Sequence, residues 1–243
     1  MVLSQDRTSG GITFGEVNED AEPVEGHRQH RYIPPPGATR VLLVRHGESE
    51  PAMPGRPFPL KDGHGDPDLH PEGHRQAELL AARIADGEAD VAAIYVTTLR
   101  RTHQTAAPLA ALLGLVPIVE PDLREVHLGE WEGGEFRVRA ANGDPVFAEV
   151  MRQQRWDLIP GAESHADFDA RLQAGLGRIV RANPHRTVVA VVHGGVIGQL
   201  LAHCVGTSGF AFVGSDNASI SELVVDGDRQ VLRRFNDTAH LRN

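Results

Sequence analysis

Two histidines stand at matching places in this sequence, each directly after a run of apolar residues with the pattern of a buried strand. "VLLVRHG" ends in Arg45, His46 and Gly47, and "VVAVVHGG" reaches His193 and Gly194. A single histidine after a strand is more often structural than catalytic. Two such strand ends in one parallel sheet point to the same edge, where ligands bind. We therefore expect His46 and His193 to lie side by side, with Arg45 next to them.

A second arginine follows another predicted strand. Arg101, in "TLRRTHQTA", falls in the first turn of a predicted helix. Free backbone N–H groups and the helix dipole favour an anion there. A guanidinium adds paired donors that match the geometry of a phosphate. The sequence thus favours a phosphate site near Arg101, whereas we expect the neighbouring Arg100 to be solvated on the helix surface.

The stretch "DLREVHLGEWEGGEF" supplies acidic residues that could act as a proton donor at this phosphate site. A carboxylic acid opposite a nucleophilic imidazole can protonate a leaving oxygen, and as a carboxylate it can then activate water. Glu125, Glu130 and Glu132 all compete for this role, and the local sequence alone does not separate them. Trp131 and Trp156 are expected to be packing residues.

Strands and helices must alternate along the chain to position these residues. The predicted strands are 39–46, 90–97, 116–120 and 187–195, the predicted helices are 72–87, 99–114, 145–155, 165–182 and 196–206, and 218–226 with 230–237 form a closing antiparallel pair. This alternation indicates a three-layer α/β/α sandwich with a mainly parallel central sheet. Pro108 is expected to bend the helix 99–114 or to split its start.

The first part of the chain has a different character. Residues 1–38 are polar and rich in Gly, Glu, Pro and Asp, and they run into "RYIPPPGATR". Three successive prolines cannot continue a helix or a central strand. We expect residues 1–38 to be an irregular extension and residues 39–243 to form one domain.

The bulk composition restricts the class of protein. The net charge of -9 argues against a broad nucleic-acid-binding surface. No apolar run approaches the roughly 20 residues that cross a bilayer, and the N-terminus lacks the features of a signal peptide. The single cysteine, Cys204, allows no intrachain disulfide. We expect a cytoplasmic protein with neither nucleic acid nor membrane among its partners, and a homodimer is one candidate oligomeric state.

Six segments, taken together and in order, resemble the histidine phosphatase superfamily, also called the phosphoglycerate mutase-like family. They are "LLVRHGES", "LHPEGHRQA", "TLRRTHQTA", "LREVHLGEWEG", "PGAESHADFDAR" and "VVHGGVIGQLL", and they span nearly all of residues 40–223. An Arg-His-Gly motif alone is short, but six segments in one order make the resemblance specific. It implies a phosphoglycerate mutase-like fold and transfer of phosphate from a small phosphorylated substrate to a histidine, without a metal or cofactor.

The resemblance also implies which residues are catalytic. They are His46 as the nucleophile, Arg45 and Arg101 as the phosphate-holding arginines, His193 as the second histidine of the pocket and Glu125 as the proton donor. Glu125 is preferred because Gly129 lies at the family's spacing after it, which Glu130 and Glu132 do not match. Substrate contacts are expected at Arg45, Gly47, Ser49, Arg101 and Gly194. Asn217 resembles a supporting position behind the second histidine.

Three functions are compatible with these residues. A phosphatase would pass the phosphate from His46 to water, and a phosphoglycerate mutase would return it to the substrate. The segment "ESEPAMPGRPFP" departs from the mutase pattern, so we favour the phosphatase. A catalytically inactive binding protein on the same scaffold would be expected to have lost a pocket residue, and all five are present.

The long loop after the first strand carries two weaker signals. "KDGHGDPDLHPEGH" holds His64, Asp66, Asp68, His70 and His74. These could bind a metal, but they lack regular ligand spacing and we expect none. Residues 50–68 are predicted to form a lid over the substrate. In this lid Arg56 and Lys61 could meet a second anionic group of the substrate, or they could simply be solvated. The lid and residues 130–160 are expected to decide the substrate.

Overall fold

The computed structural model describes residues 29–87, 90–207 and 210–242. Residues 34–243 form one compact unit. Residues 29–38 contain a turn but no helix or strand, and the first strand begins at Thr39. The predicted irregular extension falls mostly on residues 1–28, which lie outside the described residues.

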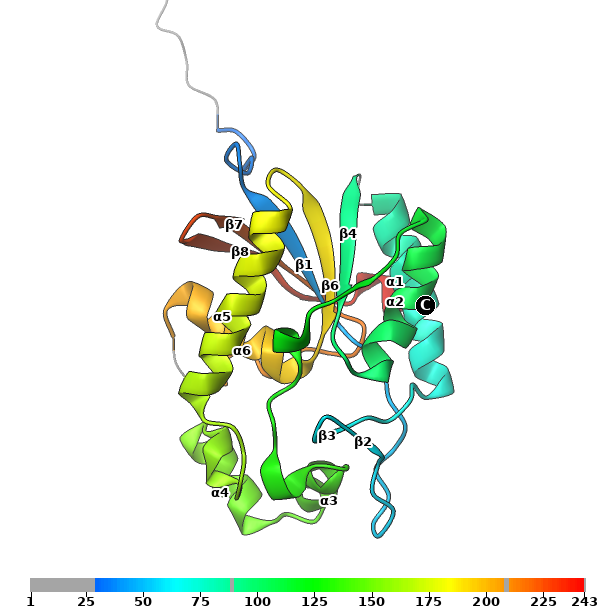
Figure 1. The fold of residues 1–243 in the computed structure, drawn as a ribbon, viewed down its shortest axis with the longest axis vertical. Coiled ribbons are helices and arrows are strands. Elements are labelled where there is room, and N and C mark those ends of the chain that lie inside the picture. The colour runs from blue at the N-terminus through cyan, green and yellow to red at the C-terminus, as the bar shows by residue number, and fades with distance from the viewer. Residues whose placement is uncertain (1–28, 88–89, 208–209, 243) are drawn as a thin grey trace, which may run out of the picture. The chain divides into compact units, whose positions relative to one another are not determined.

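A six-stranded sheet forms the centre of this unit, in the order β5-β4-β6-β1-β7-β8 (Figure 1). The strands are β1 (Thr39–Arg45), β4 (Val91–Val96), β5 (Ile118–Val119), β6 (Thr187–Val192), β7 (Ile220–Asp226) and β8 (Arg229–Asp237). The first four strands in this order are parallel, whereas β7 and β8 are antiparallel additions at one side. The predicted mainly parallel sheet with a closing antiparallel pair is confirmed.

Helices cover both faces of the sheet (Figure 1). They are α1 (Pro71–Gly87) and α2 (Arg100–Leu113) on one face, and α5 (His165–Ala182) and α6 (Gly194–Val205) on the other. Strand β1 explains the arrangement, because its side chains alternate between two cores. Leu42 and Val44 pack with residues of α1 and α2, while Val41 and Leu43 pack with residues of α5 and α6. A strand buried on both faces therefore appears in the sequence as an unbroken apolar run.

Helix α2 runs from Arg100 to Leu113 with Pro108 inside it, so the helix is not split as the sequence suggested. One face of α2 supplies Ala106, Leu109 and Ala110 to the core that it shares with α1. This packing offsets the loss of the single backbone hydrogen bond that a proline removes. The helix ends at Gly114, whose left-handed backbone (φ 66°) suits a glycine.

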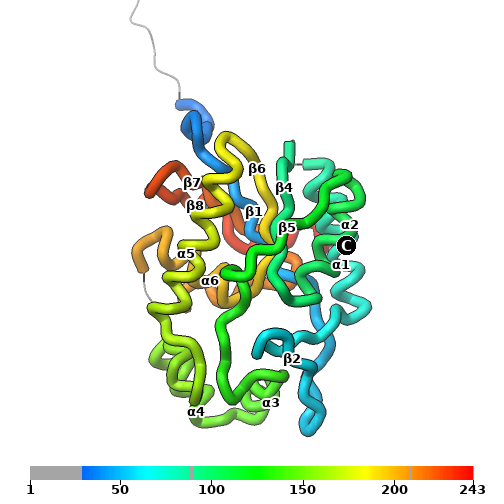
Figure 2. The backbone as a smooth tube through the Cα atoms, viewed as in Figure 1, coloured from blue at the N-terminus to red at the C-terminus, as the bar shows by residue number. Residues whose placement is uncertain are grey.

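Further elements lie beyond the C-terminal ends of the parallel strands (Figures 1 and 2). They are the hairpin β2 (Leu60–Lys61) and β3 (His64–Gly65) and the helices α3 (Glu135–Ala141) and α4 (Pro145–Gln153). The backbone N–H of Phe58 donates to the Gly133 carbonyl at 2.9 Å, so the loop before β2 is tied to the start of α3. Short 3-10 turns occur at Pro121–Leu123, Gly129–Trp131, Trp156–Leu158 and Ala239–Leu241. Helix α3 was not predicted from the sequence.

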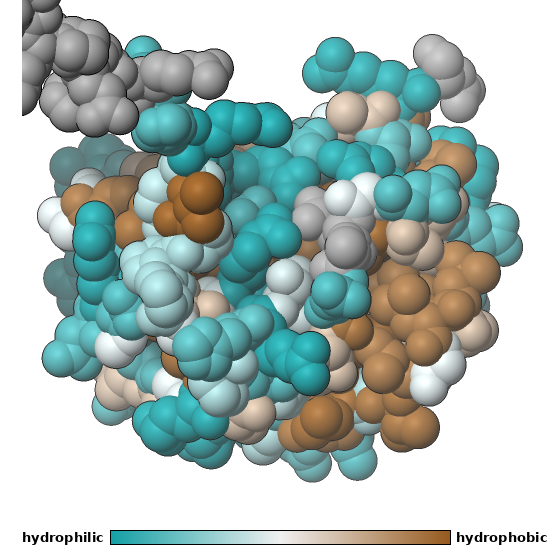
Figure 3. All heavy atoms as spheres, turned by 90° about the horizontal axis from the view of Figure 1, so that it is seen from above, coloured by the Kyte–Doolittle hydropathy of each residue, from teal (hydrophilic) through white to brown (hydrophobic). Residues whose placement is uncertain are grey.

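Apolar side chains gather on one side of the face drawn in Figure 3. Exposed apolar residues lie at the end of α2, in the edge strand β5 and in the segment between them. They are Leu112, Val116, Ile118 and Val119.

Within the described ranges, no helix combines the length and the apolar character that a bilayer span requires.

Candidate active site

The sheet brings the two predicted histidines together. Strands β1 and β6 are parallel neighbours, and Arg45 pairs with Val192 in their register. The residues that follow, His46 and His193, therefore lie at the same edge, with ring centroids 5.2 Å apart. Both side chains are buried.

His46 is held as a neutral imidazole with a defined tautomer. Its Nδ1 lies 2.7 Å from the Gly47 carbonyl oxygen, so Nδ1 carries the proton and donates it. Nε2 is then the atom with a free electron pair, and it accepts a hydrogen bond from Arg101 Nε at 3.2 Å. Burial, followed by the charges of Arg101 and Arg45, holds the pKa of His46 well below its ordinary value. A neutral Nε2 of this kind is suited to nucleophilic attack.

His193 is oriented by a threonine that the sequence analysis did not single out. Its Nε2 lies 3.0 Å from the hydroxyl of Thr97, which also accepts a hydrogen bond from the Leu99 N–H. Nδ1 of His193 is buried and has no hydrogen-bond partner among the described residues. With the Thr97 hydroxyl donating to Nε2, Nδ1–H is left as an unused donor. The only local signal for Thr97 was its position as the last residue of the predicted strand 90–97.

Arg45 and Arg101 form no ion pair with a carboxylate in the described part of the chain, although the charge of Glu125 acts on both guanidinium groups. Arg45 donates to the Ser215 carbonyl through Nη1, and Arg101 donates to the Gly65 carbonyl at 2.8 Å. Burial lowers the pKa of both groups, that of Arg101 to about 10, so both remain charged at neutral pH. Two buried guanidinium groups that form no ion pair with a carboxylate favour binding of an anion.

The structure distinguishes one of the three competing glutamates, Glu130, from the other two. Glu125 lines a cavity of about 310 Å³ together with His46 and Arg101. Its Oε1 accepts from the Val126 N–H at 3.0 Å, and its Oε2 accepts from the Gly195 N–H at the start of α6 at 3.1 Å. Glu132 also faces this cavity, and its two oxygens likewise accept from the backbone N–H groups of Gly65 and Leu128. Glu130 is exposed and does not line the cavity.

At Gly47 and Gly195 an added Cβ would meet a close neighbour. A Cβ on Gly47 would lie 2.5 Å from the Gly73 carbonyl oxygen, so Gly47 makes room for the first turn of α1. A Cβ on Gly194 would find ordinary contact distances. One on Gly195 would come within 2.4 Å of Glu125 Oε1. At the start of α6, Gly195 is therefore the glycine that lets the Glu125 side chain come close to the backbone.

Arg100 is exposed on the helix surface, as expected, but it also forms ion pairs. Its Nε donates to Asp66 at 3.1 Å and its Nη1 to Asp68 at 2.9 Å, while its backbone N–H donates to Asp66 Oδ1. Asp66 is buried, so this contact fixes the end of the β2–β3 hairpin to the start of α2. Since Arg101 follows directly, the same contact helps to position Arg101. Local sequence did not indicate these ion pairs because the partners of Arg100 lie more than thirty positions away.

The remaining residues of "KDGHGDPDLHPEGH" do not converge. Nε2 of His64 lies 3.2 Å from the Glu125 carbonyl oxygen, and the His70 ring contacts the Glu72 backbone instead. Across the residues that the structure describes, no group of three or more His, Cys, Asp or Glu side chains is arranged to hold a metal.

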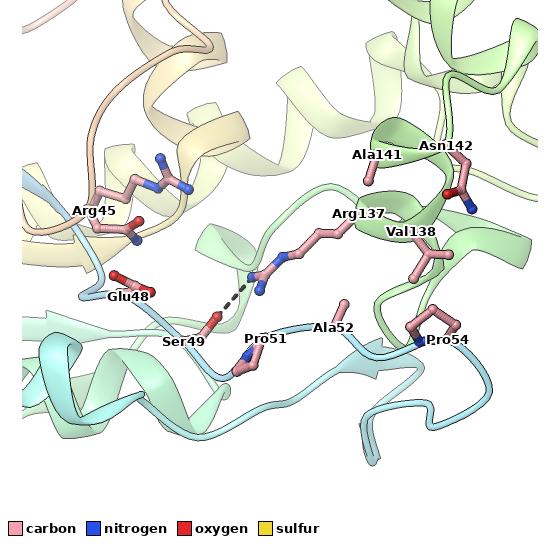
Figure 4. Close-up of a pocket in the computed structure, with 11 residues that line it drawn as sticks. Arg45, Glu48, Ser49, Pro51, Ala52, Pro54, Arg137, Val138, Ala141 and Asn142 are labelled. Atoms are coloured by element: carbon pink, nitrogen blue, oxygen red, sulfur yellow. Dashed lines mark hydrogen bonds between the residues drawn. The ribbon is translucent and has the colours of Figure 1, made fainter.

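The predicted lid contributes cavity walls, but not through its cations. Ser49, Pro51, Ala52 and Pro54 line a second cavity of about 520 Å³, which shares Arg45 and Arg137 with the first (Figure 4). Arg56 and Lys61 are exposed and line neither cavity. Phe58, His64, Gly65 and Pro67 line the first cavity.

Three other residues complete the surroundings. Asn217 was expected behind the second histidine, but it donates from Nδ2 to the His46 carbonyl at 2.9 Å and so supports the first. Trp131 and Trp156 are buried in the core beside α5 and α6, and they also line the first cavity. The two tryptophans therefore serve both as packing residues and as its apolar wall.

Comparison with known proteins identifies the class that this fold and site define. Residues 41–238 match the histidine phosphatase superfamily, branch 1, and the chain belongs to this family. It is 32% identical over 206 residues to phosphoserine phosphatase 1 of Hydrogenobacter thermophilus, covering 83% of this chain and 94% of that protein. The structure of a mycobacterial glucosyl-3-phosphoglycerate phosphatase is similar with a TM-score of 0.68 and 28% identity, covering 83% of this chain and 100% of that one.

A phosphoglycerate mutase from Bacillus anthracis is similar with a TM-score of 0.68 and 21% identity, covering 84% of this chain and 96% of that chain. At this identity the likeness shows the fold alone. The predicted phosphoglycerate mutase-like fold is confirmed, and the family and its relatives confirm the prediction that the chain is a phosphatase of this superfamily.

Proposed function

We propose that this chain hydrolyses small phosphomonoesters through a phosphohistidine formed at His46. The observation that carries the proposal is the state of the His46 ring. It is buried and neutral, its Nε2 has the free electron pair, and the positive charges of Arg101 and Arg45 act on it. This arrangement supplies a nucleophile and the positive charge that an in-line phosphoryl transfer needs.

In the first step Nε2 of His46 forms a bond to phosphorus while the bond from phosphorus to the ester oxygen breaks. Arg101 Nε, which donates to Nε2 in the unliganded site, would turn its hydrogen bond to a phosphate oxygen. Arg45 and the unused Nδ1–H of His193 would hold the other oxygens. Glu125, protonated at this stage, gives its proton to the leaving oxygen.

In the second step water attacks the phosphohistidine. Glu125, now a carboxylate, takes a proton from the water as its oxygen bonds to phosphorus, and the bond from phosphorus to Nε2 breaks. Inorganic phosphate leaves and the neutral imidazole returns. No step draws on a metal, so we expect activity to persist in the presence of a chelator.

The size of the two cavities supports a small substrate. Their volumes, about 310 and 520 Å³, suit a metabolite and not a folded protein. The printed names of the relatives, phosphoserine phosphatase and glucosyl-3-phosphoglycerate phosphatase, point to the same class of substrate. We further propose a cytoplasmic enzyme whose catalytic domain begins at residue 39. The apolar residues around β5 support a homodimer.

The proposed function is tested by hydrolysis of p-nitrophenyl phosphate by the wild-type protein, His46→Asn and His74→Asn. His74 is exposed on α1 and serves as the matched control. We expect the wild type and His74→Asn to hydrolyse the ester equally and His46→Asn to lose at least about 1,000-fold in kcat. Equal rates for the His46 variant and the wild type would exclude it as the nucleophile. Conversion of 3-phosphoglycerate to 2-phosphoglycerate without release of phosphate would instead indicate a mutase.

A further inference from the structure

A third arginine, Arg137 on α3, reaches the region between the two cavities and lines both of them. Figure 4 shows its side chain extending from α3 toward Ser49, with Arg45 entering from the opposite side. Nη2 of Arg137 donates to Ser49 Oγ at 2.8 Å, and Nη1 donates to the Glu50 carbonyl at 3.1 Å. These two contacts fix the direction of the guanidinium without neutralising its charge.

The charges around Arg137 leave it available for an anion. Among the described residues it forms no ion pair with a carboxylate, unlike its neighbour Arg139, which pairs with Glu135 and Asp144. Burial lowers the pKa of Arg137, the charge of Arg45 lowers it further, and the charge of Glu48 raises it. Glu48 forms no ion pair with Arg137, so the repulsion between the two arginines still favours binding of an anionic ligand.

The proposed phosphoryl transfer already employs Arg45 and Arg101, which balance the two charges of a phosphomonoester. We propose that Arg137 binds a carboxylate of the substrate, so that the enzyme selects small phosphomonoesters that carry a carboxylate near the ester. This inference rests on the proposed phosphatase function. It assigns the recognition of a second anionic group of the substrate to Arg137 on α3. The sequence had suggested Arg56 and Lys61 of the predicted lid for this role.

The surroundings favour a carboxylate over a second phosphate. A guanidinium fork matches the two oxygens of a carboxylate. Glu48 lines the same cavity as Arg137, and its negative charge acts on that guanidinium. A dianionic phosphate would be repelled by Glu48 about twice as strongly as a monoanionic carboxylate. Ser49 and Asn142, which line this cavity, add neutral polar groups that tolerate either a hydroxyl or an amine on the substrate.

The test compares two esters that share a three-carbon chain, 3-phosphoglycerate and glycerol 3-phosphate, by the release of phosphate. Only the first has a carboxylate. For the wild type we expect kcat/KM to favour 3-phosphoglycerate by about tenfold to a hundredfold. Arg137→Gln should bring this ratio close to one, mainly by lowering kcat/KM for 3-phosphoglycerate. Arg137→Lys keeps the charge and should retain part of the preference.

Arg152→Gln is the control, because it also removes one arginine from this region but from the exposed surface of α4. It should keep the wild-type ratio. An equal loss on both esters in Arg137→Gln would show that Arg137 holds the phosphate, and the inference would be wrong. If the wild type itself has similar kcat/KM values for the two esters, the inference is wrong as well. Hydrolysis of p-nitrophenyl phosphate is measured alongside, and its absence in the wild type would reject the phosphatase function itself.

Discussion

At the scale of single residues, the chemistry depends on which ring nitrogens carry protons. The Gly47 carbonyl fixes the proton of His46 on Nδ1, and Thr97 fixes the opposite ring, that of His193. Both histidines are buried, and both have pKa values held well below the ordinary one, first by desolvation and next by the charge of Arg101. The site therefore pairs two neutral histidines, which the proposed function uses as a nucleophile and a hydrogen-bond donor.

The contact between Thr97 and His193 leads to a prediction. Thr97→Val keeps the shape of the side chain but removes the hydroxyl, which leaves Nε2 of His193 without its partner. We expect kcat to fall by about tenfold, with a small change in KM, because the histidine is no longer held in one tautomer. Thr97→Ser restores the hydroxyl and should recover most of the loss.

Thr98→Val is the matched control for this experiment. The Thr98 hydroxyl is buried and has no partner among the described residues, so its removal should leave kcat unchanged. Thermal unfolding of all three variants shows whether a loss of activity reflects a loss of stability. Full activity in Thr97→Val would mean that the hydrogen bond does not position His193.

Much of this site was predictable from residue types and their order, because these residues stand next to recognisable strands and helix starts in the sequence. His46, Arg45 and His193 follow apolar runs that could only be buried strands, and Arg101 opens a helix. Gly195, Thr97 and Arg137 were not predicted. Their roles arise from contacts with residues far away in the chain, such as that of Gly195 with Glu125, and no local pattern records such contacts.

At the scale of elements, the register of the sheet sets the site. Strands β1 and β6 pair from Arg40 with Thr187 to Arg45 with Val192, and this places the two histidines at one level. A shift of one residue would turn His46 toward the other face of the sheet. The two apolar cores oppose such a shift, because alternate residues of β1 belong to different cores.

Hydrophobic periodicity predicted the long helices, but it did not predict the short helix α3 beside the site. Helices α1, α2, α5 and α6 are amphipathic or buried over three or more turns, and the sequence showed them. Helix α3 spans only Glu135–Ala141 and buries no residue completely, so it has no apolar stripe to detect. Its place depends on tertiary contacts at Gly133 and Ser49.

At the scale of the whole molecule, the two buried histidines make the free energy of unfolding depend on pH. In the folded state their pKa values lie well below 6.5, the ordinary value that the unfolded chain regains. Below that pH the unfolded chain binds protons that the folded protein does not. The free energy of unfolding should therefore be highest above pH 6.5 and should decrease as the pH falls through it.

Urea unfolding at about pH 7.5 and pH 5.5 measures this loss, which should reach at most about 1.4 kcal/mol for each buried histidine. His46→Asn should show a smaller loss than the wild type, since one of the two groups is gone. His74→Asn, altered at an exposed position, should behave like the wild type. An identical pH dependence in all three proteins would contradict the assignment of His46 as a buried neutral group.

The central claim is that phosphate passes through His46, and one measurement addresses it directly. The protein is quenched in alkali during turnover of p-nitrophenyl phosphate, digested and analysed by mass spectrometry, because a phosphohistidine survives alkali but not acid. We predict one phosphorylated peptide, with the phosphate on His46 and none in His46→Asn. Sustained turnover by the wild-type protein with no phosphate on His46, or with phosphate on another residue, would contradict the account.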